Sequence, residues 1–204
     1  GGKMGGDCLN YGCIPSKALI AAAKKAAALK HAAPFGVTGP QPDVNYAAVM
    51  GHVASVIAGL APHDSVERFD ALGVKVVQGY GTFIDQNSLQ VGGQIIKARR
   101  FVIATGSSAT LPPIPGLADV NYLTNETVFE NSIKPDHLVI IGGGPIGMEM
   151  AQAHARLGCQ VTVLEAFKIL ANDDPELTSI AIKAIEADGV KIREGIEIKN
   201  VSQS

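Results

Sequence analysis

The apolar residues of this chain change their spacing along its length, and the spacing predicts the elements. Between residues 45 and 60 they recur every three or four positions, as in a helix with one buried face. Consecutive apolar residues at 100–106 and 137–141 are typical of buried strands. We predict helices over residues 15–33, 45–60, 64–72, 125–130, 145–157 and 175–188. We predict strands over residues 74–77, 100–106, 137–141, 160–165, 190–193 and 196–201, and a hairpin over residues 89–96 that turns at Gly92 and Gly93.

Turn residues divide the chain into two parts. The run from Leu111 to Gly116 contains three prolines, which make it a stiff linker and the clearest boundary in the sequence. We therefore predict two domains, residues 1–112 and 113–204. Helices and buried strands of the parallel type place the chain in the α/β class, with the predicted hairpin as an addition.

The composition is that of a globular protein. With 204 residues and 47% hydrophobic content, the chain can bury a sizeable core. A formal net charge of −2 and the lack of a basic run argue against nucleic acid as a partner. No apolar run reaches the roughly 18 residues of a membrane span, and no signal peptide is recognised. We expect a cytoplasmic protein.

Two of the three cysteines, Cys8 and Cys13, are separated by four residues just before an Ala-rich helix. Pro15 suits the first turn of that helix, so Cys13 falls at or just before its N-terminus, where free N–H groups and the helix dipole favour a thiolate. Lys17 adds a positive charge one turn further on, and Gly12 lets the chain fold back so that Cys8 can reach Cys13. The pattern favours a redox-active disulfide. Half of a zinc site and an incidental pair are the alternatives that the spacing leaves open.

A glycine motif follows the strand predicted over residues 137–141. Its three glycines have G-x-G-x-x-G spacing, with a strand before them and a helix after them. The first glycine permits a tight turn, the second lets the backbone approach a pyrophosphate, and the third lets helix and strand pack closely. The helix N-terminus then faces the phosphates, which favours a dinucleotide site over a glycine turn without a ligand. The residues expected at this site are Gly142, Gly144, Pro145, Ile146 and Gly147.

Glu165 ends the second strand of this unit, about 20 residues after the motif begins, where an acidic residue binds the ribose hydroxyls. A carboxylate there would repel a 2′-phosphate, and the following Phe167 and Lys168 include no arginine pair to hold one. The sequence therefore favours NAD(H) over NADP(H). The alternative is that Glu165 merely ends a strand.

The segment from Gly5 to Lys17, GGDCLNYGCIPSK, resembles the active-site signature of the pyridine nucleotide-disulfide oxidoreductases. That signature is a cysteine, four further residues, and then Cys-x-Pro-x-Lys. The tripeptide 104–106, Ala-Thr-Gly, is similar to the element that joins the FAD and NAD domains of this family. The family comprises flavoproteins such as dihydrolipoamide dehydrogenase, mercuric reductase and glutathione reductase. The resemblance spans essentially the whole chain and implies parts of two Rossmann-like, three-layer domains that bind FAD and NAD.

The resemblance also implies roles for individual residues. Electrons would pass from NADH through FAD to a Cys8–Cys13 disulfide. Cys13 would be the charge-transfer thiolate that faces the flavin, and Cys8 the interchange thiol that reacts with the substrate. Lys17 would lie near the reactive edge of the flavin, held there by Glu149, and stabilise negative charge on the reduced ring. The alternative for Glu149 is an acid favoured by the dipole at the start of a helix.

Further positions match those that line FAD in the family, and two residues depart from its pattern. Asp7 occupies a place where the family often has a small hydroxyl or apolar residue, so its charge near the pyrophosphate would need to be neutralised. Pro145 stands where glutathione reductase carries an aromatic lid, which argues against that branch. The positions expected to line FAD are Gly5, Gly6, Asp7, Lys17, Gly81, Thr105 and Gly106.

The resemblance covers only the middle of the family's chain. The first strand and glycine turn for the FAD adenosine, the second FAD segment and the dimer domain have no counterpart here. We therefore expect a fragment that does not turn over substrate alone, and a homodimer for the full-length protein.

The function we expect is that of an NADH-linked, FAD-dependent disulfide reductase of the dihydrolipoamide dehydrogenase type, acting on a lipoyl or other small disulfide. Mercuric reductase, acting on Hg(II), is the alternative within the family. A non-catalytic NAD-binding module is the alternative of another class, and a thiol-based metal or redox sensor is disfavoured because both motifs occur in the family's order. No resident metal is predicted.

Overall fold

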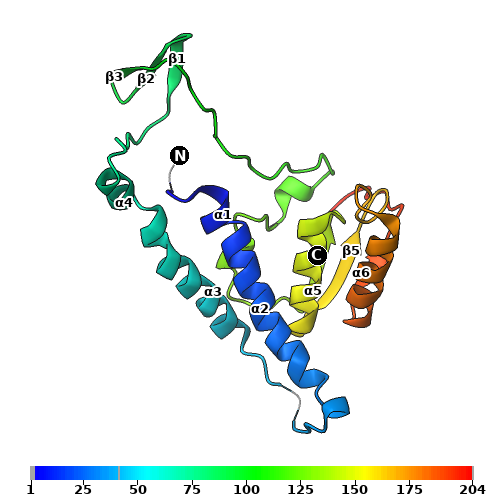
Figure 1. Ribbon diagram of the computed structural model, residues 1–204. Coiled ribbons are helices and arrows are strands. Elements are labelled where there is room, and N and C mark those ends of the chain that lie inside the picture. The colour runs from blue at the N-terminus through cyan, green and yellow to red at the C-terminus, as the bar shows by residue number, and fades with distance from the viewer. Residues whose placement is uncertain (1–2, 41, 204) are drawn as a thin grey trace.

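The computed structural model describes residues 3–40 and 42–203 and shows a mixed α/β protein (Figure 1). The first part is helical and consists of α1 (Gly6–Asn10), α2 (Cys13–Lys30), η1 (Ala33–Phe35), α3 (Tyr46–Leu60), η2 (Ala61–Asp64) and α4 (Val66–Ala71). A small sheet of β1 (Thr82–Asp85), β2 (Ser88–Val91) and β3 (Gln94–Lys97) follows. The last part contains η3 (Leu117–Asp119), η4 (Val128–Glu130), β4 (His137–Ile141), α5 (Pro145–Arg156), β5 (Gln160–Leu164), α6 (Pro175–Ala187) and β6 (Lys191–Arg193).

Helices α3, α4 and α6 start at side chains that accept hydrogen bonds from their first amides, whereas α1, α2 and α5 have no side-chain cap. Asn45 precedes α3 and its side-chain oxygen accepts from the N–H of Ala48 at 3.0 Å. Asp174 precedes α6 and accepts from the N–H of Glu176 at 2.9 Å, with Pro175 at the first helical position as predicted. Such caps stabilise a helix by about 1 kcal/mol each, because the first amides have no partner within the helix.

Strands β4, β5 and β6 form a parallel sheet in that order. Leu138 pairs with Val161 and Ile140 with Val163, and the register continues through Leu164 and Arg193 into β6. Helix α5 returns the chain from β4 to β5, and α6 returns it from β5 to β6. This is the βαβ organisation expected for residues 137–165, and together with the helices it confirms the α/β class.

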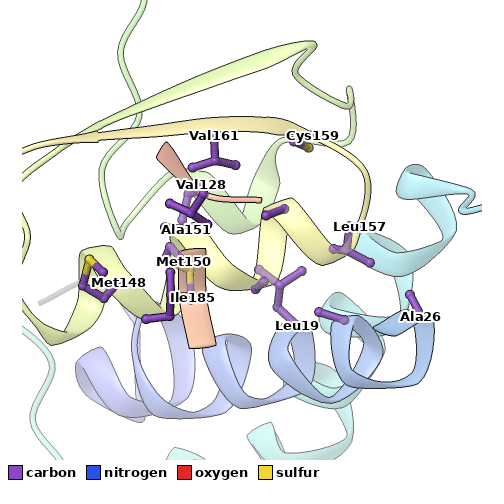
Figure 2. Packing of buried hydrophobic residues seen from close by; sticks show 14 of the residues in the cluster. Leu19, Ala26, Val128, Met148, Met150, Ala151, Leu157, Cys159, Val161 and Ile185 are labelled. Carbon is purple, nitrogen blue, oxygen red and sulfur yellow. The ribbon is translucent and has the colours of Figure 1, made fainter. Parts of the chain in front are cut away.

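One hydrophobic core joins the helical part to the parallel sheet. Figure 1 shows α2 between α3 and α5, and α2 contacts both. Figure 2 shows Leu19 of α2 facing the side chains of α5, and Leu19 is fully buried. Val163 of β5 and Val53 of α3 belong to the same buried cluster. The cysteine helix and the helix of the glycine motif are therefore packed into a single unit.

The predicted hairpin is confirmed. Strands β2 and β3 are antiparallel, and Val91 pairs with Gln94 across the turn. Gly92 and Gly93 have φ values of 54° and 77°, a left-handed pair that tight hairpin turns require and that glycine adopts without strain. The sheet stands apart from the core in Figure 1, so it contributes little to the packing around the helices.

Three predicted strands are wrong. Residues 74–77, 100–106 and 196–201 form no strand in the described chain. In the segment 100–106 the apolar side chains are not buried, since Val102 is 92% and Ile103 is 74% exposed. The segment 196–201 is held by separate hydrogen bonds, one of them from the N–H of Val201 to the carbonyl oxygen of Pro115 at 2.9 Å. In each case the described chain places no neighbouring strand beside the segment to form a ladder of hydrogen bonds, and an extended segment without such a ladder is not a strand.

Smaller corrections concern burial and helix lengths. Strand β4 forms as predicted but is not buried on both faces, because Val139 is 50% exposed. The helix expected over residues 125–130 is reduced to η4, and the one expected over 64–72 is divided into η2 and α4. The boundary near residue 113 stays a prediction. Among the described residues, no helix is both long and apolar enough to cross a membrane.

Candidate functional site

The two cysteines lie at the junction of the first two helices. Cys8 is on α1, a short helix that was not predicted, and Cys13 is the first residue of α2, as predicted. Both side chains are exposed free thiols. Gly12 makes the turn between them, and a Cβ at this position would lie 3.1 Å from the carbonyl oxygen of Asp7. Glycine therefore permits the close return that brings Cys8 toward Cys13.

The two thiols interact. The pKa of Cys8 is raised above its ordinary value, chiefly because its thiol hydrogen-bonds to Cys13, then because of slight desolvation, and then because of negative charge on Cys13. The two sulfurs are coupled, so their titration belongs to the pair rather than to either cysteine. Two coupled thiols suit thiol–disulfide exchange, in which a deprotonated sulfur attacks a disulfide.

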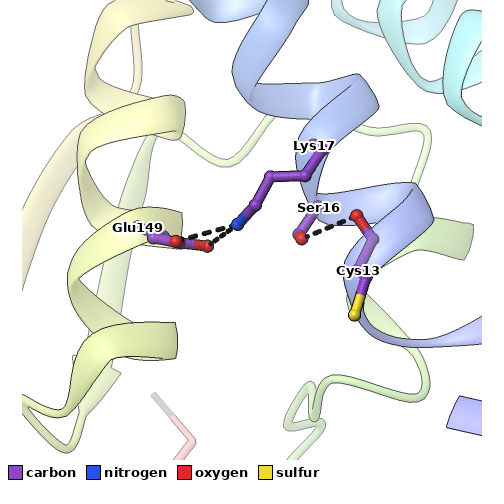
Figure 3. Close-up of polar contacts among 4 residues, drawn as sticks. All are labelled: Cys13, Ser16, Lys17 and Glu149. Atoms are coloured by element: carbon purple, nitrogen blue, oxygen red, sulfur yellow. Dashed lines mark hydrogen bonds and ion pairs between the residues drawn. The ribbon is translucent and has the colours of Figure 1, made fainter. Parts of the chain in front are cut away.

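Lys17 connects the cysteine helix to the glycine motif. Figure 3 shows its side chain extending from α2, one turn beyond Cys13, to the carboxylate of Glu149 on α5. The Nζ atom donates to both carboxylate oxygens, at 2.8 and 2.6 Å. Both side chains are partly exposed, at 60% and 43%, so the pair contributes little to stability and its effect is mainly to fix the ammonium.

The ion pair borders a cavity of about 250 Å³ between α2 and α5. Lys17, Ile20 and Ala23 line it on one side, and Glu149 and Gln152 on the other. Each helix thus contributes both charged and apolar side chains to the wall. The pairing of Lys17 with Glu149, which sequence reasoning expected from the resemblance, places a fixed charge at this cavity.

The glycine loop between β4 and α5 has the geometry of its motif. Gly142 has a φ of 110°, and its N–H donates to the carbonyl oxygen of Leu164 on β5 at 2.9 Å. At Gly147, a Cβ would collide with the carbonyl oxygen of Gly142. A side chain at the third glycine would therefore push the helix away from the loop.

The N-terminus of α5 is open to a ligand. Gly144 is the residue before the helix, and a Cβ there would have no heavy atom within 4 Å. Pro145 occupies the first helical position, where its missing N–H removes no hydrogen bond, and Ile146 next to it is 68% exposed. The first amides of a helix attract anions. Here the residue before the helix is a glycine, so it has no side chain to cover these amides.

Glu165 follows β5 and holds the glycine loop. Its carboxylate accepts from the N–H of Gly143 and from the N–H of Phe167, both at 2.8 Å. The pKa of Glu165 is lowered, first by the bond from Gly143 and then by the bond from Phe167, while the charge of Glu194 acts in the opposite direction. The side chain is therefore ionised at neutral pH and fixed against the loop that the phosphates of a dinucleotide would approach.

The residues expected to line FAD are only partly brought together. Gly5 and Gly6 precede the cysteines with φ values of 86° and 56°. A Cβ at Gly106 would lie 3.6 Å from the carboxylate of Asp7, so these two predicted positions are neighbours. Thr105 is exposed beside them in sequence. Gly81 lies against Leu89 of the small sheet. Figure 1 shows this sheet apart from α1 and α2.

Sequence reasoning missed two residues of the nucleotide-type site. Gly143 donates its N–H to Glu165, and a Cβ on it would collide with the side chain of Ile169. Glu194 follows β6 and accepts from the N–H of Ile169 at 2.8 Å. Its position in the sequence could have indicated Glu194. It directly follows the predicted strand 190–193, and parallel strands of one sheet end at the same edge, so Glu194 could have been expected near Glu165.

The third cysteine and the buried histidine belong to the packing. Cys159 lies in the core, as predicted, and burial raises the pKa of its thiol. His154 is 1% exposed and its ring nitrogens bond to the carbonyl oxygen of Met150 at 2.8 Å and the hydroxyl of Tyr46 at 3.1 Å. Within residues 3–40 and 42–203, no group of three or more His, Cys, Asp or Glu side chains is arranged to hold a metal ion.

A parallel βαβ unit with a glycine loop, joined by α5 to a helix that starts with a dithiol, defines a nucleotide-binding type of fold carrying a redox motif. The family profile described as pyridine nucleotide-disulphide oxidoreductase matches residues 2–204. The chain belongs to this family.

Individual relatives agree with this assignment. Mercuric reductase of Bacillus cereus is 34% identical over 99% of this chain, and the match covers 32% of that protein. Dihydrolipoyl dehydrogenase of Acholeplasma laidlawii is 32% identical over 97% of this chain and 60% of its own length. The Cu(II) complex of the HOCl-induced flavoprotein disulfide reductase RclA from Escherichia coli superimposes with a TM-score of 0.82, at 26% identity, over 99% of this chain and 43% of that chain. The chain thus spans between about a third and three fifths of these proteins.

Proposed function

We propose that this chain carries the redox disulfide and the pyridine-nucleotide site of an NADH-linked, FAD-dependent disulfide oxidoreductase of the dihydrolipoamide dehydrogenase type. The observation that carries the proposal is the ion pair of Lys17 and Glu149, at 2.6 Å. It connects the dithiol helix to the helix of the glycine motif, two elements whose separate chemistry the proposed reaction joins. The family assignment supports the same conclusion.

The glycine loop and Glu165 bind NADH in this proposal. The space around Gly144 and the uncovered amides of α5 accommodate a pyrophosphate. The ionised carboxylate of Glu165 accepts hydrogen bonds from ribose hydroxyls and repels a 2′-phosphate, so NADH is preferred to NADPH. Both oxygens of Glu165 already accept one backbone N–H each, and each keeps a lone pair for a ribose hydroxyl.

The surroundings of Cys13 fit a flavin in their charge. Two of the three N–H donors of Lys17 bind Glu149, which leaves one for a ligand. When bound, FAD supplies the chemistry that links a hydride donor to a disulfide. Lys17 stabilises negative charge that develops next to Cys13, and Glu149 keeps its ammonium in place. Asp7, beside Gly106, is the one carboxylate among the residues expected to line this cofactor, and it weakens flavin binding.

The cysteines carry out the exchange with substrate. Reduction of the Cys8–Cys13 bond by two electrons and two protons gives two thiols, of which Cys8 keeps its proton more tightly because it hydrogen-bonds to Cys13. Once deprotonated, Cys8 attacks one sulfur of a substrate disulfide and releases the other as a thiol. Cys13 then attacks Cys8, which releases the second substrate thiol and restores the bond.

A lipoyl or other small disulfide is the substrate in this proposal, and Hg(II) is the second candidate. Mercuric reductase and dihydrolipoyl dehydrogenase occur among the relatives at similar identity, 34% and 32%. NADH oxidation by the full-length protein, measured with lipoamide and with Hg(II), separates the two. Turnover of lipoamide alone supports the first, and turnover with Hg(II) alone supports the second.

The proposal is tested by a single reduction of the purified 204-residue chain. The chain is oxidised, mixed with FAD and titrated anaerobically with NADH, and the thiols formed are counted with a chromogenic disulfide reagent. We expect the thiols of Cys8 and Cys13 to appear in the wild-type chain and no new thiols in Cys8→Ser or Cys13→Ser. Cys159→Ser is the matched control, since this thiol is buried and plays no part in the exchange.

Two results contradict the proposal in different ways. NADH binding without flavin-dependent thiol formation, unaffected by Cys8→Ser, identifies a non-catalytic NAD-binding module. Thiol formation that is unchanged in Lys17→Met shows that the ion pair is structural only.

A further inference from the structure

The carboxyl edge of the parallel sheet carries two carboxylates side by side. Leu164 pairs with Arg193 as the last register partners of β5 and β6, so Glu165 and Glu194 are the next residues on neighbouring strands. The N–H of Glu165 donates to the carbonyl oxygen of Arg193 at 2.9 Å, and the N–H of Ile196 donates to that of Glu165 at 3.0 Å. Residues at the same register of parallel strands point to the same face, which places both carboxylates together.

Both carboxylates hold the loop that leaves β5. Glu165 accepts from the N–H of Phe167 at 2.8 Å, and Glu194 accepts from the N–H of Ile169, also at 2.8 Å. The N–H of Leu170 donates to the carbonyl oxygen of Gly143 at 3.0 Å, which closes the loop onto the glycine motif. The loop of residues 166–170 is therefore fixed at three of its five residues, two of them by the paired carboxylates.

Glu194 also binds the basic side chain of this loop. The Nζ atom of Lys168 lies 3.2 Å from its carboxylate, and the pKa of Glu194 is lowered, first by the N–H of Ile169 and then by Lys168. Arg193 alternates with Glu194 along the strand and so points to the opposite face. The charge of Lys168 is thus balanced by Glu194, the carboxylate next to Glu165, while its side chain stays 78% exposed.

We propose that Glu194 is a second specificity-determining residue of the dinucleotide site, which excludes a 2′-phosphate by adding a negative charge beside Glu165 and by retaining Lys168. The inference rests on the proposed function, because it concerns which dinucleotide the same site accepts. A site rejects an unwanted ligand effectively when it offers that ligand repulsion and no free counter-charge. Glu165 and Glu194 together provide the repulsion, and Glu194 also balances the charge that Lys168 would otherwise offer.

The experiment measures the dissociation constants of NADH and NADPH for the purified 204-residue chain by calorimetry, at low and high salt. Glu194→Gln keeps an oxygen that can accept from the N–H of Ile169 but removes the charge, so the loop stays held while Lys168 is released. We expect this variant to bind NADPH about 3- to 10-fold better relative to NADH than the wild-type chain does, a modest electrostatic change. The gain should shrink at high salt, because it is electrostatic and near the surface.

Matched variants separate the charge from the fold. Glu197→Gln removes the same charge three residues further on and should leave the ratio of the two affinities unchanged. Lys168→Gln should leave the ratio nearly unchanged in the wild-type chain, where Glu194 binds this lysine, and should cancel part of the gain in the Glu194→Gln chain. This dependence of one substitution on the other is the coupling that a double-mutant cycle measures.

The possible results are distinct. If the wild-type chain binds neither dinucleotide, the proposed function fails and this inference fails with it. If it binds NADH and the ratio for Glu194→Gln equals that for Glu197→Gln, the proposed function stands and Glu194 has no role in specificity. A ratio that changes equally at all salt concentrations, or regardless of Lys168, also overturns the inference, since it shows a structural effect.

Discussion

Two segments of this chain have nearly the same sequence pattern and different structures. Residues 100–106 and 137–141 are both apolar runs that lead into a glycine. The second run forms β4 and pairs with β5 along its whole length, whereas the first forms no strand and leaves Val102 92% exposed. An apolar run thus forms a strand only where a neighbouring strand accepts and donates the hydrogen bonds of its backbone.

The partner of β4 is supplied by the nearby sequence. Helix α5 follows the glycine loop, packs on the core and returns the chain beside β4, where Val161 and Val163 of β5 are buried. A βαβ unit therefore contains its own partner strand within about 30 residues. Residues 100–106 have no such return, since the hairpin before them is complete in itself and a linker follows.

The largest expected difference between the two segments is in amide exchange. The amides of residues 101–106 should exchange with solvent at nearly the rate of an unfolded peptide, because they lack partners. Those of residues 161–164, in the central strand of the sheet, should exchange only on global unfolding, which corresponds to about 5 kcal/mol or more. Hydrogen–deuterium exchange followed by mass spectrometry measures this, and equal protection of the two segments would show that 100–106 is paired in solution.

The next largest difference is expected in the free energy of unfolding when apolar side chains are shortened in the βαβ unit and in residues 100–106. Leu157 follows α5 and is 1% exposed, so Leu157→Ala should lower the free energy of unfolding by about 3 kcal/mol, through lost transfer energy and a cavity. Val102→Ala should change it by less than about 0.5 kcal/mol, since its side chain is already in water. Urea denaturation gives both values, and a cost above about 1 kcal/mol for Val102→Ala would contradict the exposed position of this segment.

Two glycines expected at cofactor sites provide a finer comparison. Gly147→Ala should cost about 2 kcal/mol and weaken NADH binding, because its Cβ collides with the backbone carbonyl of Gly142, which cannot move without disturbing the loop. Gly81→Ala should cost less than about 1 kcal/mol, because its Cβ meets only the flexible side chain of Leu89, at 3.0 Å. Thermal unfolding compares the stability of the two variants. Equal losses of stability would show that the backbone at Gly142 is not a rigid obstacle to a side chain at position 147.

The smallest expected effect is a pH dependence of the free energy of unfolding. It arises where the helical part meets the βαβ unit, at the hydrogen bond between His154 of α5 and Tyr46 of α3. Burial lowers the pKa of His154 below its ordinary value of 6.5. As the pH falls through 6.5, the unfolded chain takes up a proton that the folded chain does not, so stability decreases until the pH reaches the folded pKa. The slope is at most about 1.4 kcal/mol per pH unit for one proton.

His154→Gln, which has no titrating ring, should flatten this part of the stability curve between pH 7 and pH 5. The comparison needs only the difference between the two curves, which removes the contribution of the other histidines. Curves that stay parallel over this range would show that His154 takes up its proton equally in both states.

Much of the candidate site could be predicted from short stretches of sequence. The position of Cys13 at a helix start follows from Pro15, and the glycine loop follows from a spacing whose roles are steric and local. The ion pair of Lys17 with Glu149 joins residues 132 positions apart, and the chain's periodicity contained no sign of it. It was expected only because the cysteine string resembles that of a family in which these residues meet.

Sequence alone determined the elements that are complete within themselves: the capped helices, the hairpin with its two glycines, and the βαβ unit with Glu165 at its end. Their stabilising contacts lie within a few turns or one return of the chain, so local pattern is sufficient. The tertiary structure decided which apolar runs became strands, that α2 packs against α5, and that Glu194 stands beside Glu165 and binds Lys168. These outcomes depend on which surfaces meet, and no residue carries that information alone, because hydrophobic attraction is strong but not directional.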